Sequence, residues 1–153
     1  MHIPIKVDYG VRALVDLARN TGDRPVRATE IAARAAIPEP YLAQVLNALS
    51  KKGLIRSQRG PRGGHMLAMR PADIRLSAVM ACLGTTEGLV GCLDGSTSCI
   101  HTPGCAQREV WQAVEKAVFD ILDSTTVAAL VARTEAIQDE RIRQNLAVPT
   151  AAT

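Results

Sequence analysis

The fold is decided by residues 39–64, which read EPYLAQVLNALSKKGLIRSQRGPRGG. The apolar residues in the first half of this stretch recur at helical spacing: Leu42, Val45, Leu46 and Leu49. This periodicity predicts a helix over about 40–52, which a glycine ends. Residues 54–58 and 66–69 then predict two short strands joined by a glycine-rich turn at 59–65. A helix followed directly by a β-hairpin is therefore expected.

Two more helices are expected ahead of this stretch. One spans about 7–19, where the apolar residues form a single face: Val7, Val11, Leu14, Val15 and Ala18. Residues 30–36 predict a second, short helix, and Pro38 and Pro40 mark a sharp connector to the third. Two helices joined by a tight turn and followed by a hairpin are typical of a winged helix-turn-helix. We therefore expect a mostly α fold with a small β wing.

The second half is expected to hold a long helix after an irregular segment. Residues 76–83 predict a further helix, whereas residues 84–104 are rich in Gly, Ser and Thr and lack periodicity. A long helix is expected over 105–122, with a wide apolar stripe: Val110, Trp111, Val114, Ala117, Val118, Ile121 and Leu122. Such a stripe is typical of core packing and, in its more specific form, of a dimer seam. A last short helix is expected over 127–133.

These segments suggest that the chain has four parts. We expect a winged helix-turn-helix DNA-binding domain at 1–83 and a cysteine-rich sensor loop at 84–104. Residues 105–133 are expected to form the C-terminal dimerisation helix and a short packing helix. The polar, alanine-rich residues 134–153 are expected to form a flexible tail.

The net charge is unevenly distributed along the 153 residues. The whole chain carries +3, but residues 1–80 hold 13 Lys and Arg against 6 Asp and Glu, a net of +7. Residues 81–153 hold 5 against 9, a net of −4. Five basic residues and no acid lie between positions 51 and 62, at the end of the predicted helix and in the hairpin. A basic hairpin directly after a helix-turn-helix indicates that the first half binds DNA.

Composition argues against several other classes of protein. Aromatic residues make up only 3% of the chain, too few for a protein that stacks the bases of single-stranded nucleic acid. No apolar run is long enough to span a membrane, and the N-terminal residues show no secretory signal, so a cytoplasmic protein is expected. The chain lacks a Cys-x-x-Cys pair, a nucleophile–base pair and a phosphate-binding loop, so an enzyme is not expected.

The exposed face of the helix over 40–52 carries the side chains expected in the major groove: Tyr41, Gln44, Asn47 and Lys51. The amides of Gln44 and Asn47 can read adenine through two hydrogen bonds, and Lys51 can hold a phosphate. For Tyr41, phosphate contact and packing against the first helix are both open. Arg59 and Arg62, at the tip of the hairpin, suit insertion into the minor groove, where the negative potential is deepest.

Three of the four cysteines lie in or beside the irregular segment: Cys92, Cys99 and Cys105. Clustered thiols in a cytosolic protein are more typical of a metal or redox site than of disulfides. Separated by six and then five residues, three thiolates can bind three irons of a cubane cluster or most of a tetrahedral zinc shell. Cys82, inside an apolar helix, is expected to behave as a buried small hydrophobe.

Three stretches together resemble the Rrf-type winged-helix transcriptional regulators. They are IPIKVDYG at 3–10, YLAQVL at 41–46 and LIRSQRGPRGG at 54–64, and the similarity extends over roughly residues 1–133. The resemblance implies a regulator, in many members a repressor, that binds a palindromic double-stranded DNA operator as a homodimer. The dimerisation helix of the family matches residues 105–122. The resemblance also implies that an iron–sulfur cluster, 4Fe–4S or 2Fe–2S, controls DNA affinity in response to redox state, nitric oxide or iron.

The resemblance assigns Cys92, Cys99 and Cys105 as cluster ligands. For a fourth ligand, family members use a histidine shortly after the third cysteine or an acidic residue near the start of the partner subunit's first helix. This chain has Arg108 at the first place and Asp8 at the second, so Asp8 is the expected ligand. The alternative is a clusterless or zinc-bound winged-helix regulator that senses oxidants directly through its thiols.

Overall fold

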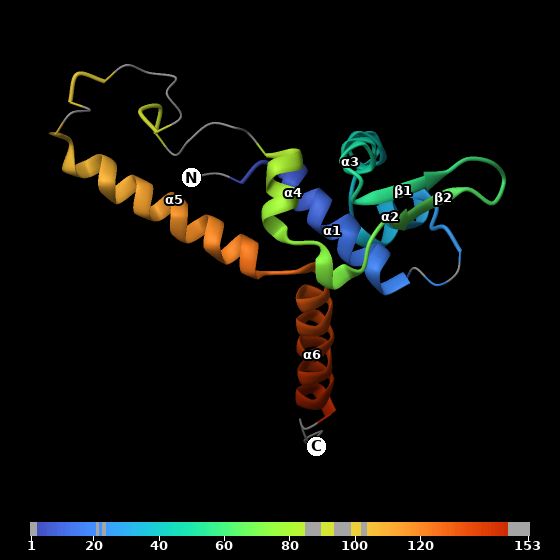
Figure 1. The fold of residues 1–153 in the computed structure, drawn as a ribbon. Helices are drawn as coiled ribbons and strands as arrows, with labels where there is room; N and C mark the ends of the chain where they lie inside the picture. The colour runs from blue at the N-terminus through green and yellow to red at the C-terminus, as the bar shows by residue number, and fades with distance from the viewer. Residues whose placement is uncertain are drawn as a thin grey trace.

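The structure is a computed structural model that describes residues 3–20, 22, 24–84, 90–93, 99–101 and 104–146. Over these residues it contains six α-helices, a short 3₁₀ helix and one two-stranded sheet (Figure 1). In chain order the elements are α1 (Ile5–Asn20), α2 (Ala28–Ala35), α3 (Glu39–Lys51), β1 (Ile55–Gln58), β2 (Gly64–Leu67), η1 (Pro71–Asp73), α4 (Leu76–Leu83), α5 (Ala106–Ser124) and α6 (Val127–Leu146). The mostly α fold with a small β wing is confirmed.

Helices α1, α2 and α3 enclose the hydrophobic core. The predicted apolar face of α3 is at most 2% exposed: Leu42, Val45, Leu46 and Leu49. The turn into α3 places Ala36 in the left-handed region (φ 52°), and the next residue, Ile37, is buried. Gly53, with φ of 72°, follows the end of α3 and lets the Leu54 N–H reach the Leu49 carbonyl at 3.0 Å. The helix-turn-helix is therefore fixed by local backbone geometry and by one shared core.

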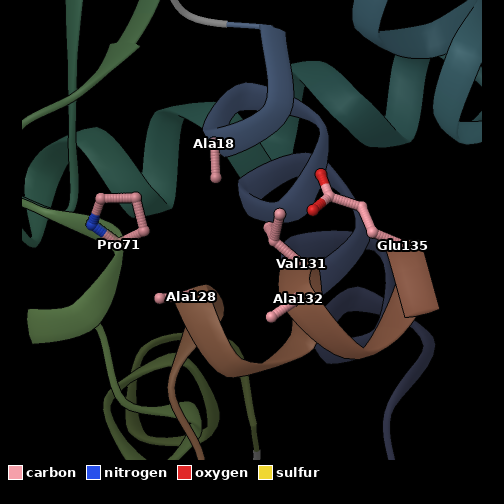
Figure 2. Close-up of a pocket in the computed structure, with 6 residues that line it drawn as sticks. All are labelled: Ala18, Pro71, Ala128, Val131, Ala132 and Glu135. Atoms are coloured by element: carbon pink, nitrogen blue, oxygen red, sulfur yellow. The ribbon is translucent and has the colours of Figure 1, made fainter.

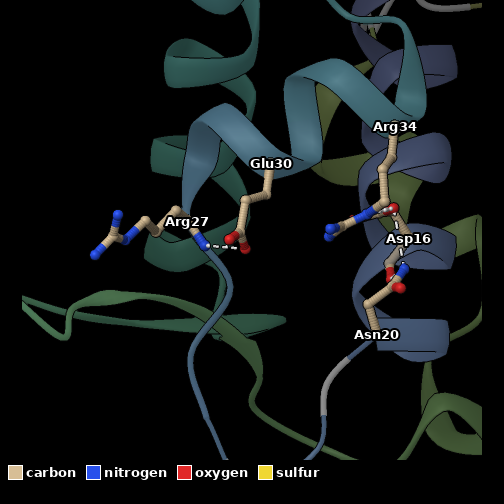
Figure 3. A network of polar contacts seen from close by, with 5 residues as sticks. All are labelled: Asp16, Asn20, Arg27, Glu30 and Arg34. Carbon is tan, nitrogen blue, oxygen red and sulfur yellow. Dashed lines mark hydrogen bonds and ion pairs between the residues drawn. The ribbon is translucent and has the colours of Figure 1, made fainter.

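A buried carboxylate ties α1 to α2. Asp16 is 8% exposed and accepts two hydrogen bonds from the Arg34 guanidinium, at 2.8 and 2.9 Å. The Asn20 amide donates to the Asp16 backbone and side-chain oxygens at 2.7 and 3.1 Å. Figure 3 shows both side chains converging on this carboxylate. The pair satisfies a buried charge and holds α2 against α1.

The wing is a hairpin whose second strand is held, close to the turn, by the connector between α1 and α2. Strands β1 and β2 pair antiparallel, from Ile55 opposite Leu67 to Gln58 opposite Gly64. Val26, just before α2, exchanges two backbone hydrogen bonds with His65, at 2.9 and 2.7 Å. Gly64 lies so close to the Val26 backbone that a Cβ has no room there. Strand β2 is therefore held by β1 on one side and by the connector on the other.

The junction between α5 and α6 is fixed to the start of α4. The Leu76 N–H donates to the Thr125 carbonyl at 3.0 Å, and the Val127 N–H donates to the Ile74 carbonyl at 2.9 Å. Asp123 joins this junction by accepting hydrogen bonds from Ser77 (2.6 Å) and Arg75 (2.7 Å). The bond from Ser77, with the charge of Arg75, lowers the pKa of the Asp123 carboxyl.

From this junction α5 runs outward, on the side of the molecule opposite the wing (Figure 1). The expected long helix over 105–122 is confirmed as α5. None of its residues is buried within the single chain.

The last helix is longer than expected. Helix α6 continues to Leu146, so the prediction that helical structure ends at residue 133 was wrong. Val127 at its start is fully buried, and Arg19 of α1 donates to Gln138 at 3.1 Å. Residues 134–146 contain neither Gly nor Pro and are mostly good helix formers, so the helix continues after its apolar periodicity has ended.

A shallow pocket of about 180 Å³ lies where α6 passes α1 and η1. Figure 2 shows its lining residues: Ala18, Pro71, Ala128, Val131, Ala132 and Glu135. None of the predicted site residues contributes to it. Among the helices described, none is long and apolar enough to cross a membrane.

Candidate nucleic-acid interface and cysteine site

The four α3 residues expected to face DNA all lie on the solvent side of the helix: Tyr41, Gln44, Asn47 and Lys51. They are opposite the buried apolar face, so they are free of the core that holds the helix in place. The side of α3 that faces water therefore presents two amides, a phenol and an ammonium group to any partner. This set is able to donate and accept hydrogen bonds at base edges and to neutralise phosphate charge.

Tyr41 also packs against the first helix. Its ring meets the ring of Tyr9 edge to face, with the centroids 6.1 Å apart, yet Tyr41 stays 48% exposed. The Arg12 guanidinium lies 5.9 Å from the Tyr9 ring centroid and forms an ion pair of 2.7 Å with Asp8. A row of contacts thus runs from Asp8 on α1 to Tyr41 on α3.

The tip of the wing is a tight turn that exposes two arginines. Gly60 has a φ of 108°, and the Gly63 N–H closes the turn on the Gly60 carbonyl at 2.8 Å. A Cβ at Gly63 would collide with the backbone oxygens of Gln58 and Gly60, so this turn requires glycine. Arg59 and Arg62 flank the turn and are both exposed. The structure therefore brings the two predicted arginines together at one projecting end.

Two further arginines lie on the connector that pairs with the wing, and no pattern in the sequence predicted them. Arg24 and Arg27 are exposed and lie in the connector that pairs with β2. The Arg27 Nη2 donates to the Pro61 carbonyl at the wing tip, at 3.3 Å. The signal in the sequence was the pair of arginines around Pro25-Val26, an extended dipeptide immediately before a helix. Its pairing with residue 65 could not be inferred from sequence spacing.

His65 makes the stability of the wing depend on pH. Its ring Nδ1 lies 2.9 Å from the Ser57 hydroxyl, and burial lowers the pKa of the imidazole from its ordinary value of 6.5. Below pH 6.5 the imidazole of His65 is protonated more readily in the unfolded chain than in the folded chain. The free energy of unfolding therefore falls as pH falls from 6.5 towards the lower pKa of the folded state. As pH falls below 6.5, we expect the thermal midpoint of the wild type to drop more than that of His65→Gln. Above pH 6.5 the midpoints of the two proteins should change with pH in the same way. Equal drops of the two proteins below pH 6.5 would contradict the assignment.

The three cysteines of the predicted site are all half-buried: Cys92, Cys99 and Cys105. Cys105 lies at the start of α5, where it precedes the first helical residue. Within the described part of the chain, no three Cys, His or carboxylate groups lie close enough to hold a metal ion. The structure therefore does not bring the predicted ligands together. Cys82 is half-buried against the core, and burial raises the pKa of its thiol.

The donor chemistry near these cysteines suits an anionic, sulfur-ligated group. Arg108 lies on the first turn of α5, and among the described residues its buried Nε has no hydrogen-bond partner. A buried guanidinium N–H requires an acceptor, and thiolates or sulfides are acceptors. Half-buried thiols and a buried guanidinium N–H three residues after Cys105 are chemically compatible with an iron–sulfur cluster, although the described residues do not bring the three thiols together. Asp8, in contrast, is engaged with Arg12 in the single chain.

Comparison with known proteins gives a consistent result. The sequence profile of the Rrf2 family, described as an iron-dependent transcriptional regulator, matches residues 3–133. Protein rrf2 of Nitratidesulfovibrio vulgaris (strain Hildenborough) is 32% identical over 131 residues, which cover 86% of this chain and 87% of that protein.

Two solved structures show the same architecture. T. potens IscR is similar with a TM-score of 0.74 and 33% identity, over 90% of this chain and 91% of that one. CymR, the global cysteine regulator of B. subtilis, is similar with a TM-score of 0.73 and 29% identity, over 87% of this chain and 98% of that one.

The matched region contains the whole winged helix-turn-helix, including the exposed face of α3 and the wing with arginines at its tip. These relatives are regulators of transcription and not enzymes. The chain is a DNA-binding regulator of transcription, and it belongs to the Rrf2 family.

Proposed function

We propose that this protein is a repressor that binds a palindromic operator as a homodimer, with DNA affinity controlled by an iron–sulfur cluster at Cys92, Cys99 and Cys105. The observation that carries the proposal is the position of these cysteines between the end of α4 and the start of α5. The two helices are joined at their other ends through Arg75, Ser77 and Asp123 (2.6–2.7 Å).

Helix α4 connects the cysteine segment to the DNA-binding helices. Its last residue, Leu83, and Val79 pack on α1 at Gly10, where a Cβ would collide with the Leu83 side chain. Helix α4 also contacts α3. A change of structure in the cysteine segment would therefore move a helix that packs directly on α1 and α3. In a dimer, the distance between the two copies of α3 must match two half-sites one helical turn apart.

In this proposal the residues have distinct roles on DNA. Gln44 and Asn47 read base edges, Tyr41 and Lys51 hold phosphates, and Arg59 and Arg62 enter the minor groove. Residues 1–83 form the DNA-binding domain and residues 84–104 form the sensor segment. The apolar stripe on α5 forms the dimer seam, supported by the exposure of Val110 (58%) and Ile121 (65%).

The cluster, 4Fe–4S or 2Fe–2S, supplies a group whose charge and integrity respond to redox state, nitric oxide or iron supply. The description of the family as iron-dependent supports it. Cys92, Cys99 and Cys105 of one subunit would hold the cluster, with Asp8 of the partner subunit as fourth ligand. Asp8 pairs with Arg12 through Oδ2 in the single chain, and its second carboxylate oxygen would serve as the ligand atom.

Single cysteine variants test this assignment. We expect anaerobically purified wild type to show the broad visible absorbance of iron–sulfur proteins, with iron and sulfide in comparable amounts. Cys92→Ser, Cys99→Ser and Cys105→Ser should each lose most of it, because a hydroxyl is a poor ligand for this group. Cys82→Ser is the matched control and should keep it, since Cys82 packs against the core. Removal of iron should change the DNA affinity of the wild type, and the same treatment should leave the DNA affinity of the three variants unchanged.

A second candidate is a clusterless or zinc-bound regulator that senses oxidants through thiols. The similarity to a global cysteine regulator favours it, as does the separation of the described cysteines. Colourless anaerobic protein, with stoichiometric zinc or no metal and with peroxide-dependent DNA affinity, would establish this candidate and exclude the first.

A further inference from the structure

Arg27 bonds to two elements that are far apart in sequence. Its backbone forms the start of α2, where its N–H donates to the Glu30 carboxylate at 3.4 Å and its carbonyl accepts from the Glu30 N–H at 3.1 Å. Its guanidinium reaches the other way, to the Pro61 carbonyl at the wing tip at 3.3 Å. Figure 3 shows the Arg27 side chain pointing away from Glu30. One residue thus connects α2, the first helix of the helix-turn-helix, to the end of the hairpin.

The strands of the wing are held close to the turn. The backbone pairing of Val26 with His65 and the close approach of Gly64 fix the hairpin where β2 begins. Beyond that point residues 59–63 project, closed on themselves by the bond between Gly63 and Gly60. Residues 59–63 lie beyond the last pair of the ladder, Gln58 with Gly64, so strand pairing does not set the direction of the tip. The bond of Arg27 to Pro61 connects these residues to the rest of the domain.

We propose that Arg27 is a positioning residue that holds Arg59 and Arg62 in the orientation in which the wing binds DNA. The inference rests on the proposed role of these two arginines at the minor groove. An ordered tip loses less conformational freedom on binding, so the bond of Arg27 to the carbonyl of Pro61 increases affinity without touching DNA. The bond is solvent-exposed, so its effect on affinity is modest in size.

Arg27→Ala tests the proposal, with Arg24→Ala as the matched control. Both residues are exposed connector arginines, but the structure shows the bond to the wing tip only for Arg27. The probe is a duplex selected from random sequence by the wild-type protein. We expect Arg27→Ala to weaken binding roughly 3- to 10-fold in the wild-type background, and less than about 2-fold once Arg59 and Arg62 are alanine. An equal loss in both backgrounds, with the salt slope lowered by about 0.9, would identify Arg27 as a direct phosphate contact and overturn the proposal.

Amide hydrogen exchange provides a second readout that needs no DNA. Exchange across residues 59–63 should become faster in Arg27→Ala and stay unchanged in Arg24→Ala, while exchange in α2 stays the same in both. Unchanged exchange at the tip in Arg27→Ala would overturn the positioning role even if affinity fell. If the wild type bound no duplex, the DNA-binding role of the wing would fail, while this measurement would still show whether Arg27 orders the tip.

Discussion

Replacing Ile121 by aspartate is expected to split the proposed homodimer and to lower affinity for its proposed operator by roughly 100-fold or more. Ile121 is 65% exposed in the single chain and lies on one face of α5 with Val110, Val114 and Ala117. Two-fold symmetry places the new carboxylate in the apolar seam twice, where desolvation of charge opposes association. Once the subunits separate, each half-site binds alone and the gain from linked binding is lost. Sedimentation and fluorescence anisotropy measure the two effects.

Gln112→Asp is the matched control for this substitution. Gln112 is exposed on the other side of α5, so the same charge is added to the same helix outside the stripe. It should leave both the dimer and DNA affinity close to wild type. If Ile121→Asp also remains dimeric, the seam lies elsewhere than on this face of α5.

The double variant Arg59→Ala, Arg62→Ala is expected to lose roughly 10- to 100-fold in affinity for each arginine that inserts into the groove. Both side chains project from a turn that glycine closes, so their removal leaves the hairpin backbone intact. The slope of log affinity against log salt should become shallower by about 0.9 for each lost phosphate contact. Binding measured over a series of salt concentrations gives both quantities.

Removing two arginines from α6 controls for the change in net charge. Arg141 and Arg143 are exposed near the end of that helix, which points away from the wing (Figure 1). Arg141→Ala, Arg143→Ala should change affinity far less than the wing variant. Similar losses for the two double variants would mean that overall charge, and not the wing, accounts for binding.

Local patterns in the sequence predicted most of the winged helix-turn-helix. The spacing of Leu42, Val45, Leu46 and Leu49 identified α3 and its exposed face, because one turn of helix is a local repeat. The glycines at 60 and 63 marked the turn, and the structure shows why glycine is needed there. The helix over 76–83 was predicted with the bounds that α4 has. The end of α6 was missed because propensity continues a helix after its apolar periodicity ends.

Contacts between distant segments could not be predicted in this way. The pairing of Val26 with His65 and the bond of Arg27 to Pro61 join residues 39 and 34 positions apart. The link from Arg75 and Ser77 to Asp123 joins positions 48 and 46 apart. Sequence spacing contains no signal for such pairs, because they form only after the core has brought the elements together.

The sequence by itself therefore determined the helices and the hairpin of the winged helix-turn-helix, the exposed face of its third helix and the residues at the tip of its wing. Periodicity and turn chemistry are properties of neighbouring residues, and they act before any tertiary contact forms. Only the tertiary structure decided that a connector arginine reaches the wing and that α4 lies between the cysteines and the DNA-binding helices. Both arrangements depend on where burial of one shared core places segments that are remote in the chain.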